Sequence, residues 1–383
     1  MDQLEEKYNR GFRHIEDFEE AFRVVRVEED RYVGAHRLEL PMIGARGVYG
    51  GHTAAQSLLV GIRCVRDDPS RADFLPESFH MYFIAAGDPR VPMSYEVAKL
   101  YDDENMSKRS IKVIQKGRVR SNVLVTMVKP GYKTQKAVDI AMPVPPLQLK
   151  YPDPNKLYQV HHTGYVRNAY SDEFVDYSLC PEEDALYPAE RWITVFSGIR
   201  NQPEPGKENE FDELEEVIVD SKGKEMKSTK KIMRPHNQQS FKDPTNNYVA
   251  LADLSDSALL TTMARVLHLP WNPTEDHPFE EIDHSKNAMS IMPITLNALH
   301  LFHYNAMSLD HHIYFHNDNI GEDIKSYDAV KDWLCLTYQM TRHRNSRTLV
   351  RGFMYNKKHQ CVATIIQEGL TIMHDSVPEK VKL

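Results

Sequence analysis

The sequence lacks the signatures of several common protein classes. Its cysteines lie far apart and form no CxxC pair, so neither a thiolate zinc site nor a disulfide framework is expected; they are Cys64, Cys180, Cys335 and Cys361. No run of about 18 apolar residues occurs, which argues against a membrane span. The patterns GxGxxG, GxxxxGK[ST] and GxSxG are absent. Their absence argues against dinucleotide redox chemistry, nucleotide hydrolysis and serine hydrolase chemistry.

The sequence also lacks a large excess of positive or negative charge, because its net charge is only −8. We therefore expect no nucleic acid and no anionic membrane as a bulk partner. The stretch 1–7 is polar and acidic, unlike a secretory signal or a mitochondrial presequence. The C-terminal Val381-Lys382-Leu383 is close to the Ser-Lys-Leu peroxisomal address, with valine in place of the small first residue. An ordinary C-terminus is the alternative interpretation.

The chain has 383 residues, which favours two domains or two fused copies of one. The order of predicted elements repeats. In the first half, strand-like alternation precedes a helix and further strands, at 22–40, 52–65, 79–84, 94–100 and 111–128. In the second half the same order recurs, at 192–199, 248–267, 308–316, 333–341 and 348–371. This order predicts an α+β fold in which a helix packs on an antiparallel sheet, twice over.

Domain boundaries follow from composition. The proline-rich stretch that opens at Pro143 reads as the start of a linker. We expect an N-terminal unit over 20–142, a linker over 143–186 and a C-terminal unit over 187–375. Residues 203–246 are rich in Pro, Gly, Glu, Lys and Asn, and are expected to be surface insertions or partly disordered loops.

Asp256 is the first candidate for chemistry. On a helical wheel it shares an apolar stripe with Ala252, Leu259 and Met263. A carboxylate that faces the core is costly unless it is hydrogen-bonded or has a task. The sequence therefore leaves two interpretations, a structural acid and a catalytic one, and Asp253 is the competing acid one turn away.

Ser308 and Gln367 are the next candidates. By the period of two, Ser308 and Asp310 are expected to share a strand face with His312, Tyr314 and His316. The histidines there, with His300 and His303 upstream, do not have the spacing of a zinc motif, so no metal is expected. Gln367 ends a strand-like apolar run, where its amide must be paired. It is either a sheet-capping residue or a group that orients a water.

The pair Gly50-Gly51 precedes the first predicted helix. Free N–H groups at a helix start can bind an oxygen that gains negative charge, although helix-entry glycines are common. Gly51, His52 and Gln56 are therefore candidates for contact with substrate or an oxyanion.

These residues resemble the type II acyl-CoA thioesterases, a family that includes bacterial thioesterase II and the peroxisomal acyl-CoA thioesterases. The matching stretches are Gly50-Gly51 with Gln56-Ser57-Leu58, Ser78 to Phe83 with Gly87-Asp88, Leu254 to Leu260, Ser308 to His316 and Ala363 to Gly369. They span roughly 20–372, and the insertion pattern resembles the fungal peroxisomal branch.

The resemblance implies a double hotdog, with two fused units that each wrap a long helix in an antiparallel sheet. It implies a catalytic water held by Asp256, Ser308 and Gln367. Ser308 departs from the threonine of bacterial members but keeps the hydroxyl. No cofactor, metal or covalent intermediate is implied. The partner is the acyl-CoA substrate, and a homo-oligomer and a peroxisomal import receptor that reads the C-terminus are further expected partners.

The sequence therefore predicts a hydrolase that converts fatty acyl-CoA to free fatty acid and CoA. A non-catalytic acyl-CoA binding protein on the same fold is one alternative, and a hotdog enoyl-CoA hydratase is another. The expected location is the peroxisomal matrix, with the cytoplasm as the alternative.

Overall fold

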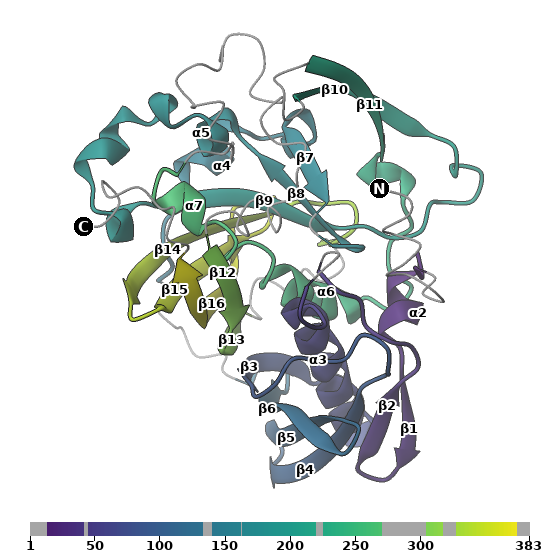
Figure 1. Ribbon diagram of the computed structural model, residues 1–383. Helices are drawn as coiled ribbons and strands as arrows, with labels where there is room; N and C mark the ends of the chain where they lie inside the picture. Colours follow the sequence, from purple (N-terminus) through teal and green to yellow (C-terminus); the bar gives the residue numbers. More distant parts are fainter. Residues whose placement is uncertain are drawn as a thin grey trace.

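The structure is a computed structural model that describes residues 14–41, 45–132, 140–161, 163–219, 225–269, 304–316 and 327–373. One antiparallel sheet of 14 strands runs through both halves of the chain, in the order β1-β2-β4-β5-β6-β3-β13-β16-β15-β14-β9-β8-β7, with β12 paired to β16 (Figure 1). The first six strands in this order come from the N-terminal half and the others from the C-terminal half.

The N-terminal half supplies one end of the sheet and a long helix. Its strands are β1 (Val24–Glu28), β2 (Arg31–Gly34), β3 (Leu75–Phe83), β4 (Ser94–Asp102), β5 (Met106–Gln115) and β6 (Arg118–Val128). Its helices are α2 (Phe18–Phe22) and α3 (Gly50–Arg66). The turn between β5 and β6 has positive φ at Lys116 and Gly117, 51° and 69°, as a tight hairpin requires and as the sequence predicts.

The C-terminal half repeats the strand order. Its strands in the large sheet are β7 (Tyr158–His161), β8 (Val166–Tyr170), β9 (Ile193–Ile199), β12 (Tyr304–Ser308), β13 (Asp310–Phe315), β14 (Leu334–Arg344), β15 (Arg347–Tyr355) and β16 (Cys361–Met373). Its helices are α4 (Pro146–Lys150), α5 (Asp172–Val175), α6 (Asn246–Leu254) and α7 (Met263–Val266). Short 3-10 turns lie at Pro69–Arg71, Pro154–Lys156, Tyr177–Leu179, Pro181–Ala185, Pro188–Glu190 and Pro235–Asn237.

The two halves join where β3 pairs with β13. His80 is opposite His312 in this register, and the Nδ1 atoms of the two rings are 3.0 Å apart. Behind the sheet α3 packs against α6, and Figure 1 shows α6 directly above α3. Both helices are buried on nearly every side, as expected of helices enclosed by a sheet.

A continuous hydrophobic core runs through both halves, between the sheet and the two helices. A second, smaller cluster covers the outer face of the C-terminal strands around Phe196, Trp333 and Phe353. Val144, Tyr151 and Leu157 pack onto this cluster. The stretch expected to be a linker, 143–186, is therefore part of the fold, because it covers the sheet and supplies β7 and β8.

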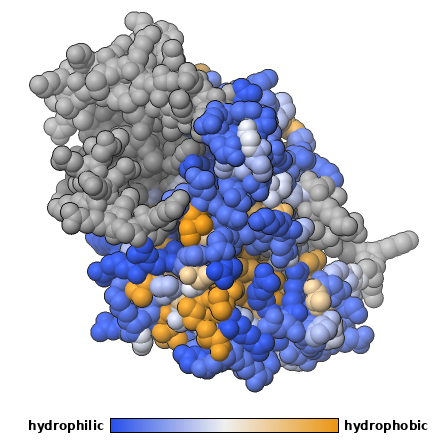
Figure 2. All heavy atoms as spheres, turned by 90° about the vertical axis from the view of Figure 1, so that its right-hand side faces the viewer, coloured by the Kyte–Doolittle hydropathy of each residue, from blue (hydrophilic) through white to orange (hydrophobic). Residues whose placement is uncertain are grey.

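The opposite end of the sheet is more open. β1 is an edge strand, and Val25 and Val27 are 42% and 54% exposed on it. Figure 2 shows the side of the molecule that includes this edge, and hydrophobic side chains gather in its lower half, over the N-terminal strands. No helix in the described residues is long and apolar enough to cross a membrane.

The helix predicted over 248–267 is wrong in extent. α6 ends at Leu254, and the chain continues through turns before the single turn of α7. In this stretch Ser255 Oγ donates to Ala252 O at 2.9 Å, and Thr262 Oγ1 donates to Ala258 O at 2.8 Å. Hydroxyls that bond to nearby carbonyls compete with helical hydrogen bonds, which explains the early end. Asp256 therefore lies beyond the helix and not on its apolar stripe.

The strand face predicted for Ser308 is also wrong. β12 aligns Ser308 with Gly369, whereas β13 aligns His312 with Ile366. From Ser308 to His312 the chain advances four residues, while the paired residues on β16, from Gly369 to Ile366, advance only three. The extra residue forms a β-bulge around Leu309. The bulge turns Ser308 to the inner face, where His311 also points, and leaves Asp310 and His312 on the outer face.

The stretch 203–246, expected to be surface insertions or partly disordered loops, contains regular secondary structure. It carries a two-stranded hairpin, β10 (Phe211–Val219) with β11 (Glu225–Met233), separate from the large sheet. Residues 374–383, which include Val381-Lys382-Leu383, and the histidines His300 and His303 lie outside the described residues.

Candidate active site

Three side chains from distant parts of the chain meet on the inner side of the C-terminal sheet. Gln367 Nε2 donates to Asp256 Oδ1 at 2.5 Å and to Ser308 Oγ at 2.8 Å. Ser308 Oγ donates to the same Asp256 Oδ1 at 3.2 Å. The structure therefore brings together the three residues that the sequence singled out, although they are 52 to 111 positions apart.

Each of these side chains is held by a different local feature. Asp256 lies in the turn after α6, Ser308 is the last residue of β12 before the bulge, and Gln367 lies within β16. Gln367 is fully buried, and Asp256 and Ser308 are partly exposed. The cluster is thus buried on the sheet side, at Gln367, and partly exposed at Asp256 and Ser308.

The N-terminus of α3, from the other half of the chain, faces the Asp256 carboxylate. The backbone N–H of Gly51 donates to this carboxylate. A Cβ atom at Gly50 would lie 2.6 Å from Asp256 Oδ2, and one at Gly51 would lie 2.6 Å from Asp253 O. Only glycine fits so close an approach, so the Gly50-Gly51 pair explains how a helix start reaches the acid.

The pKa of Asp256 is raised to about 6. Burial is the main cause, because it disfavours the charged carboxylate, and the nearby charge of Asp253 acts in the same direction. Hydrogen bonds from Gln367, Ser308 and the Gly51 backbone oppose the rise. A carboxylate with this pKa is a stronger base than an ordinary aspartate and is still largely ionised at neutral pH.

The irregular segment after α6 is fixed at several points. Ser255 Oγ and His311 Nε2 share a hydrogen bond of 2.7 Å, and Thr262 bonds to the Tyr338 hydroxyl. Farther along, Arg265 makes two hydrogen bonds to the Glu183 carboxylate, at 2.7 and 3.1 Å. These contacts replace the helical hydrogen bonds that the segment lacks, and they hold Asp256 in place.

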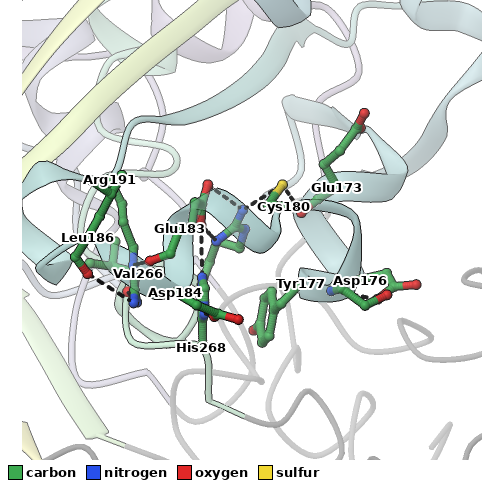
Figure 3. Close-up of polar contacts among 12 residues, drawn as sticks. Glu173, Asp176, Tyr177, Cys180, Glu183, Asp184, Leu186, Arg191, Val266 and His268 are labelled. Atoms are coloured by element: carbon green, nitrogen blue, oxygen red, sulfur yellow. Dashed lines mark hydrogen bonds and ion pairs between the residues drawn. The ribbon is translucent and has the colours of Figure 1, made fainter.

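Figure 3 shows the far end of this segment. His268 Nε2 lies 2.8 Å from Glu183 Oε2, and Arg191 Nη1 donates to the backbone oxygen of Val266 at 2.5 Å. A cavity of about 580 Å³ lies beside this network, with Val144, Phe174, Trp192 and Thr337 among its lining residues. Asp256, Ser308 and Gln367 do not line it.

The side chains of His52 and Gln56 do not join the cluster. Both are fully buried. Gln56 accepts from the Tyr95 hydroxyl at 2.6 Å and donates to Phe22 O at 3.2 Å, inside the N-terminal half. Neither side chain is placed to touch a substrate, contrary to the sequence-based expectation, because each occupies a core position on α3. Gly51 is the member of that predicted set that reaches the cluster.

Sequence reasoning missed the partner of His52. Its Nδ1 atom lies 2.7 Å from Oδ1 of Asp253, the acid that competed with Asp256. It also missed His311, which supports Ser255 from the strand below. The sequence did contain a signal for the His52–Asp253 pair, namely an acid at a core position of one predicted helix and a histidine on the other. The pairing itself depends on how the two helices pack, which the sequence does not show. Among the described residues, no three His, Cys, Asp or Glu side chains gather as metal ligands.

Comparisons with known proteins agree with this architecture. The acyl-CoA thioesterase N-terminal domain matches residues 36–128, and the acyl-CoA thioesterase C-terminal domain matches residues 193–371. The peroxisomal acyl-coenzyme A thioester hydrolase 1 of Saccharomyces cerevisiae is 24% identical over 353 residues, which are 86% of this chain and 87% of the yeast protein. Acyl-coenzyme A thioesterase 8 of Homo sapiens is 30% identical over 92 residues, 24% of this chain and 26% of the human protein.

Solved structures show the same fold. An acyl-CoA thioesterase II, TesB2, from Mycobacterium marinum has a TM-score of 0.55 at 19% identity, covering 94% of this chain and 99% of that one. A conserved protein with a hot dog fold from Alicyclobacillus acidocaldarius has a TM-score of 0.51 at 13% identity, covering 94% and 98%. The predicted α+β double hotdog is confirmed.

Proposed function

The chain belongs to the acyl-CoA thioesterase family and is an acyl-CoA thioester hydrolase, and from this premise we propose that it hydrolyses fatty acyl-CoA with a water that Asp256 activates. Ser308 and Gln367 hold the same water in line with the thioester carbonyl. The proposal adds roles for three residues to an activity that the family defines.

The reaction balances without a covalent acyl-enzyme. Asp256 accepts a proton from the water as its oxygen bonds to the carbonyl carbon. The carbonyl oxygen gains negative charge, and we assign its stabilisation to backbone N–H groups at the start of α3. When the tetrahedral intermediate collapses, the carbon–sulfur bond breaks, and the proton passes from Asp256 to the departing sulfur of CoA. The products are a free fatty acid and the CoA thiol.

The shared hydrogen bonding of Asp256 is the observation that carries this proposal. Two donors from separate strands converge on one carboxylate oxygen, at 2.5 and 3.2 Å. Burial raises the pKa of the same carboxyl to about 6, close to the value that suits a general base at neutral pH. A purely structural acid needs the hydrogen bonds but not an open side toward ligand, and Asp256 is partly exposed.

One assay tests the function. Purified protein is mixed with palmitoyl-CoA and a thiol-reactive dye, and thiol release is followed for the wild type and for Asp256→Asn. The proposal predicts release by the wild type only. A non-catalytic acyl-CoA binding protein would bind palmitoyl-CoA, seen by calorimetry, with no thiol released. An enoyl-CoA hydratase would consume an enoyl-CoA, seen as loss of its ultraviolet absorbance, also without thiol.

We propose that the enzyme lies in the peroxisomal matrix. The name of the similar yeast protein, which calls it peroxisomal, supports this location. A fluorescent protein fused to the N-terminus of the full chain should then be punctate and co-localise with a peroxisomal marker. The same fusion without Val381–Leu383 should be diffuse if the tripeptide is the address. A diffuse full-length fusion would argue for the cytoplasm and leave the hydrolase proposal intact.

A further inference from the structure

A second acid lies close behind the candidate base, in a pair with a histidine. The Nδ1 atom of His52 and the Oδ1 atom of Asp253 are 2.7 Å apart, and both side chains are 0% exposed. His52 lies in the first turn of α3 and Asp253 in the last turn of α6. The hydrogen bond therefore joins the two helices, and the two halves of the chain, at one point.

Three aromatic rings pack around the His52 side of this pair. The rings of Phe22, Tyr49 and Tyr165 meet the His52 ring edge-on, with centroids 5.3, 4.9 and 5.5 Å away. Within the part of the chain that the structure describes, His52 Nε2 and Asp253 Oδ2 have no hydrogen-bond partner. A buried pair with unsatisfied atoms is seldom better for stability than apolar side chains of the same size. Stability alone thus gives little reason for these residue types here.

Both members of the pair are directly connected to the candidate site. Gly51, which precedes His52, donates its N–H to Asp256, and Asp256 follows Asp253 by three residues. A second contact joins the same two helices: the hydroxyl of Tyr49, the residue before α3, donates to the backbone oxygen of Asp253 at 3.4 Å. A shift of α3 against α6 would therefore change the distance between the helix start and the Asp256 carboxylate.

We propose that His52 and Asp253 are a positioning pair that sets the placement and the basicity of Asp256 without touching the substrate. The inference rests on the proposed function, since it assigns a role toward the base of that reaction. The hydrogen bond keeps the start of α3 against the end of α6. The negative charge of Asp253, held in the core by His52, makes Asp256 more reluctant to lose its proton and so more basic.

Titratable side chains packed around these acids include Tyr49, Tyr165 and His311. The Tyr49 hydroxyl donates to Asp253 O, whereas the Tyr165 ring packs against His52 and its hydroxyl donates to Ile15 O. His311 lies on the opposite side, bonded to Ser255, and burial lowers its pKa to about 3, so it is neutral at physiological pH. Burial is the main reason that the pKa of Asp256 is raised, the hydrogen bonds from Gln367 and Ser308 oppose it, and the nearby charge of Asp253 adds a smaller rise.

Two variants separate positioning from packing. In Asp253→Asn the shape is kept and the charge is lost, so the low-pH midpoint of kcat/KM should move to lower pH. In His52→Leu the hydrogen bond is lost, and kcat should fall by about 10²-fold with little change in KM, as expected for misplaced reacting groups. His52→Asn should restore much of kcat, because its amide nitrogen can stand where Nδ1 stands.

A matched control is available away from the site. Ser197 Oγ donates to Asn168 Oδ1 at 2.7 Å, and both residues are 0% exposed. Ser197→Ala also removes a buried hydrogen bond, so it should lower the unfolding temperature while kcat and the pH midpoint stay at wild-type values.

The outcomes are distinct. If folded Asp253→Asn keeps the wild-type pH midpoint and folded His52→Leu keeps kcat within twofold, the positioning pair is refuted. If His52→Leu does not fold, the isosteric Asp253→Asn variant decides alone. Asp256→Asn is measured in parallel. Should it retain activity, the proposed function has failed; should it be inactive while the pair variants behave as wild type, only this inference has failed.

Discussion

Gly51 and Asp256 come from opposite halves of the chain, and the backbone N–H of Gly51 donates a hydrogen bond to the Asp256 carboxylate. The N-terminal half therefore contributes a helix start to a cluster whose side chains all belong to the C-terminal half. Since the two halves also share one sheet and one core, the candidate site depends on their packing as much as on its own residues.

Replacing Asp256 by Asn should reduce kcat by about 10²–10⁴-fold, the usual contribution of a general base. The amide cannot accept the proton of the water, although it fills the same space. Thiol release from palmitoyl-CoA measures the effect, and thermal unfolding checks that the variant is folded. Retention of more than half of wild-type turnover would remove Asp256 from the mechanism.

The pH dependence of kcat/KM should report the Asp256 carboxyl. Burial raises its pKa to about 6, so the base form is lost as the pH falls through that value. We expect kcat/KM to fall tenfold per pH unit well below 6 and to level off above 7. A profile that stays flat down to pH 4.5 in the folded protein would contradict this assignment.

The contribution of Asp256 to the unfolding free energy should fall as the pH rises, whereas its contribution to kcat/KM should grow. The pKa of Asp256 is above its value of 3.8 in an unfolded chain, so the folded state binds this proton more tightly. The associated stability is present below pH 4 and is lost as the pH rises through about 6, a difference of about 3 kcal/mol. Asp256→Asn removes this loss, so its unfolding free energy at pH 8 should exceed that of the wild type in urea titrations.

Gln367→Ala should lower kcat more than it raises KM, because a contact that orients water acts on the chemical step. Gln367 Nε2 also bonds Ser308 at 2.8 Å, so the two positions should not be additive. Ser308→Ala should be impaired, whereas Ser308→Thr keeps the hydroxyl and should be tolerated. Steady-state kinetics of these variants decide the point, and a silent Ser308→Ala would require another residue to hold the water.

Gly50→Ala should be severely impaired although Gly50 carries no chemistry. A Cβ atom there would lie 2.6 Å from Asp256 Oδ2 and 3.2 Å from the Phe83 ring. Gly61→Ala on the same helix is the control, since its Cβ atom would meet Val125 methyl carbons at 3.2 Å and no site residue. Only the first variant should lose kcat; equal losses would point to a general effect on α3.

Local patterns predicted much of this fold. The paired strands β5–β6 and β15–β16 were expected with their turns, because period-two alternation and a Lys-Gly dipeptide are short-range signals. The early end of α6 was missed, since apolar spacing continues past Leu254 while buried hydroxyls bond to the backbone instead. The bulge at Leu309 was missed because it arises from the register of pairing with β16, which no single-strand pattern contains.

The sequence predicted that Asp256, Ser308 and Gln367 meet, but it also included the side chains of His52 and Gln56, which do not join them. Asp256, Ser308 and Gln367 were selected as polar groups at core-like positions, and the resemblance to a known family supplied their proposed roles. The contact with Gly51 and the His52–Asp253 pair both cross between the two halves. Such contacts depend on how the helices pack against each other, and local sequence patterns do not reveal this packing.

Gln56 shows what duplication has done to this chain. The run Gln56-Ser57-Leu58-Leu59 in the first unit resembles Asp256-Ser257-Ala258-Leu259 in the second. In this alignment Gln56 occupies the position in the first unit that corresponds to Asp256, the proposed base, in the second. Its amide is already bonded to the Tyr95 hydroxyl and to Phe22 O, inside a closed core. The stoichiometry follows: a non-hydrolysable acyl-CoA analogue should saturate at one molecule per chain, not two.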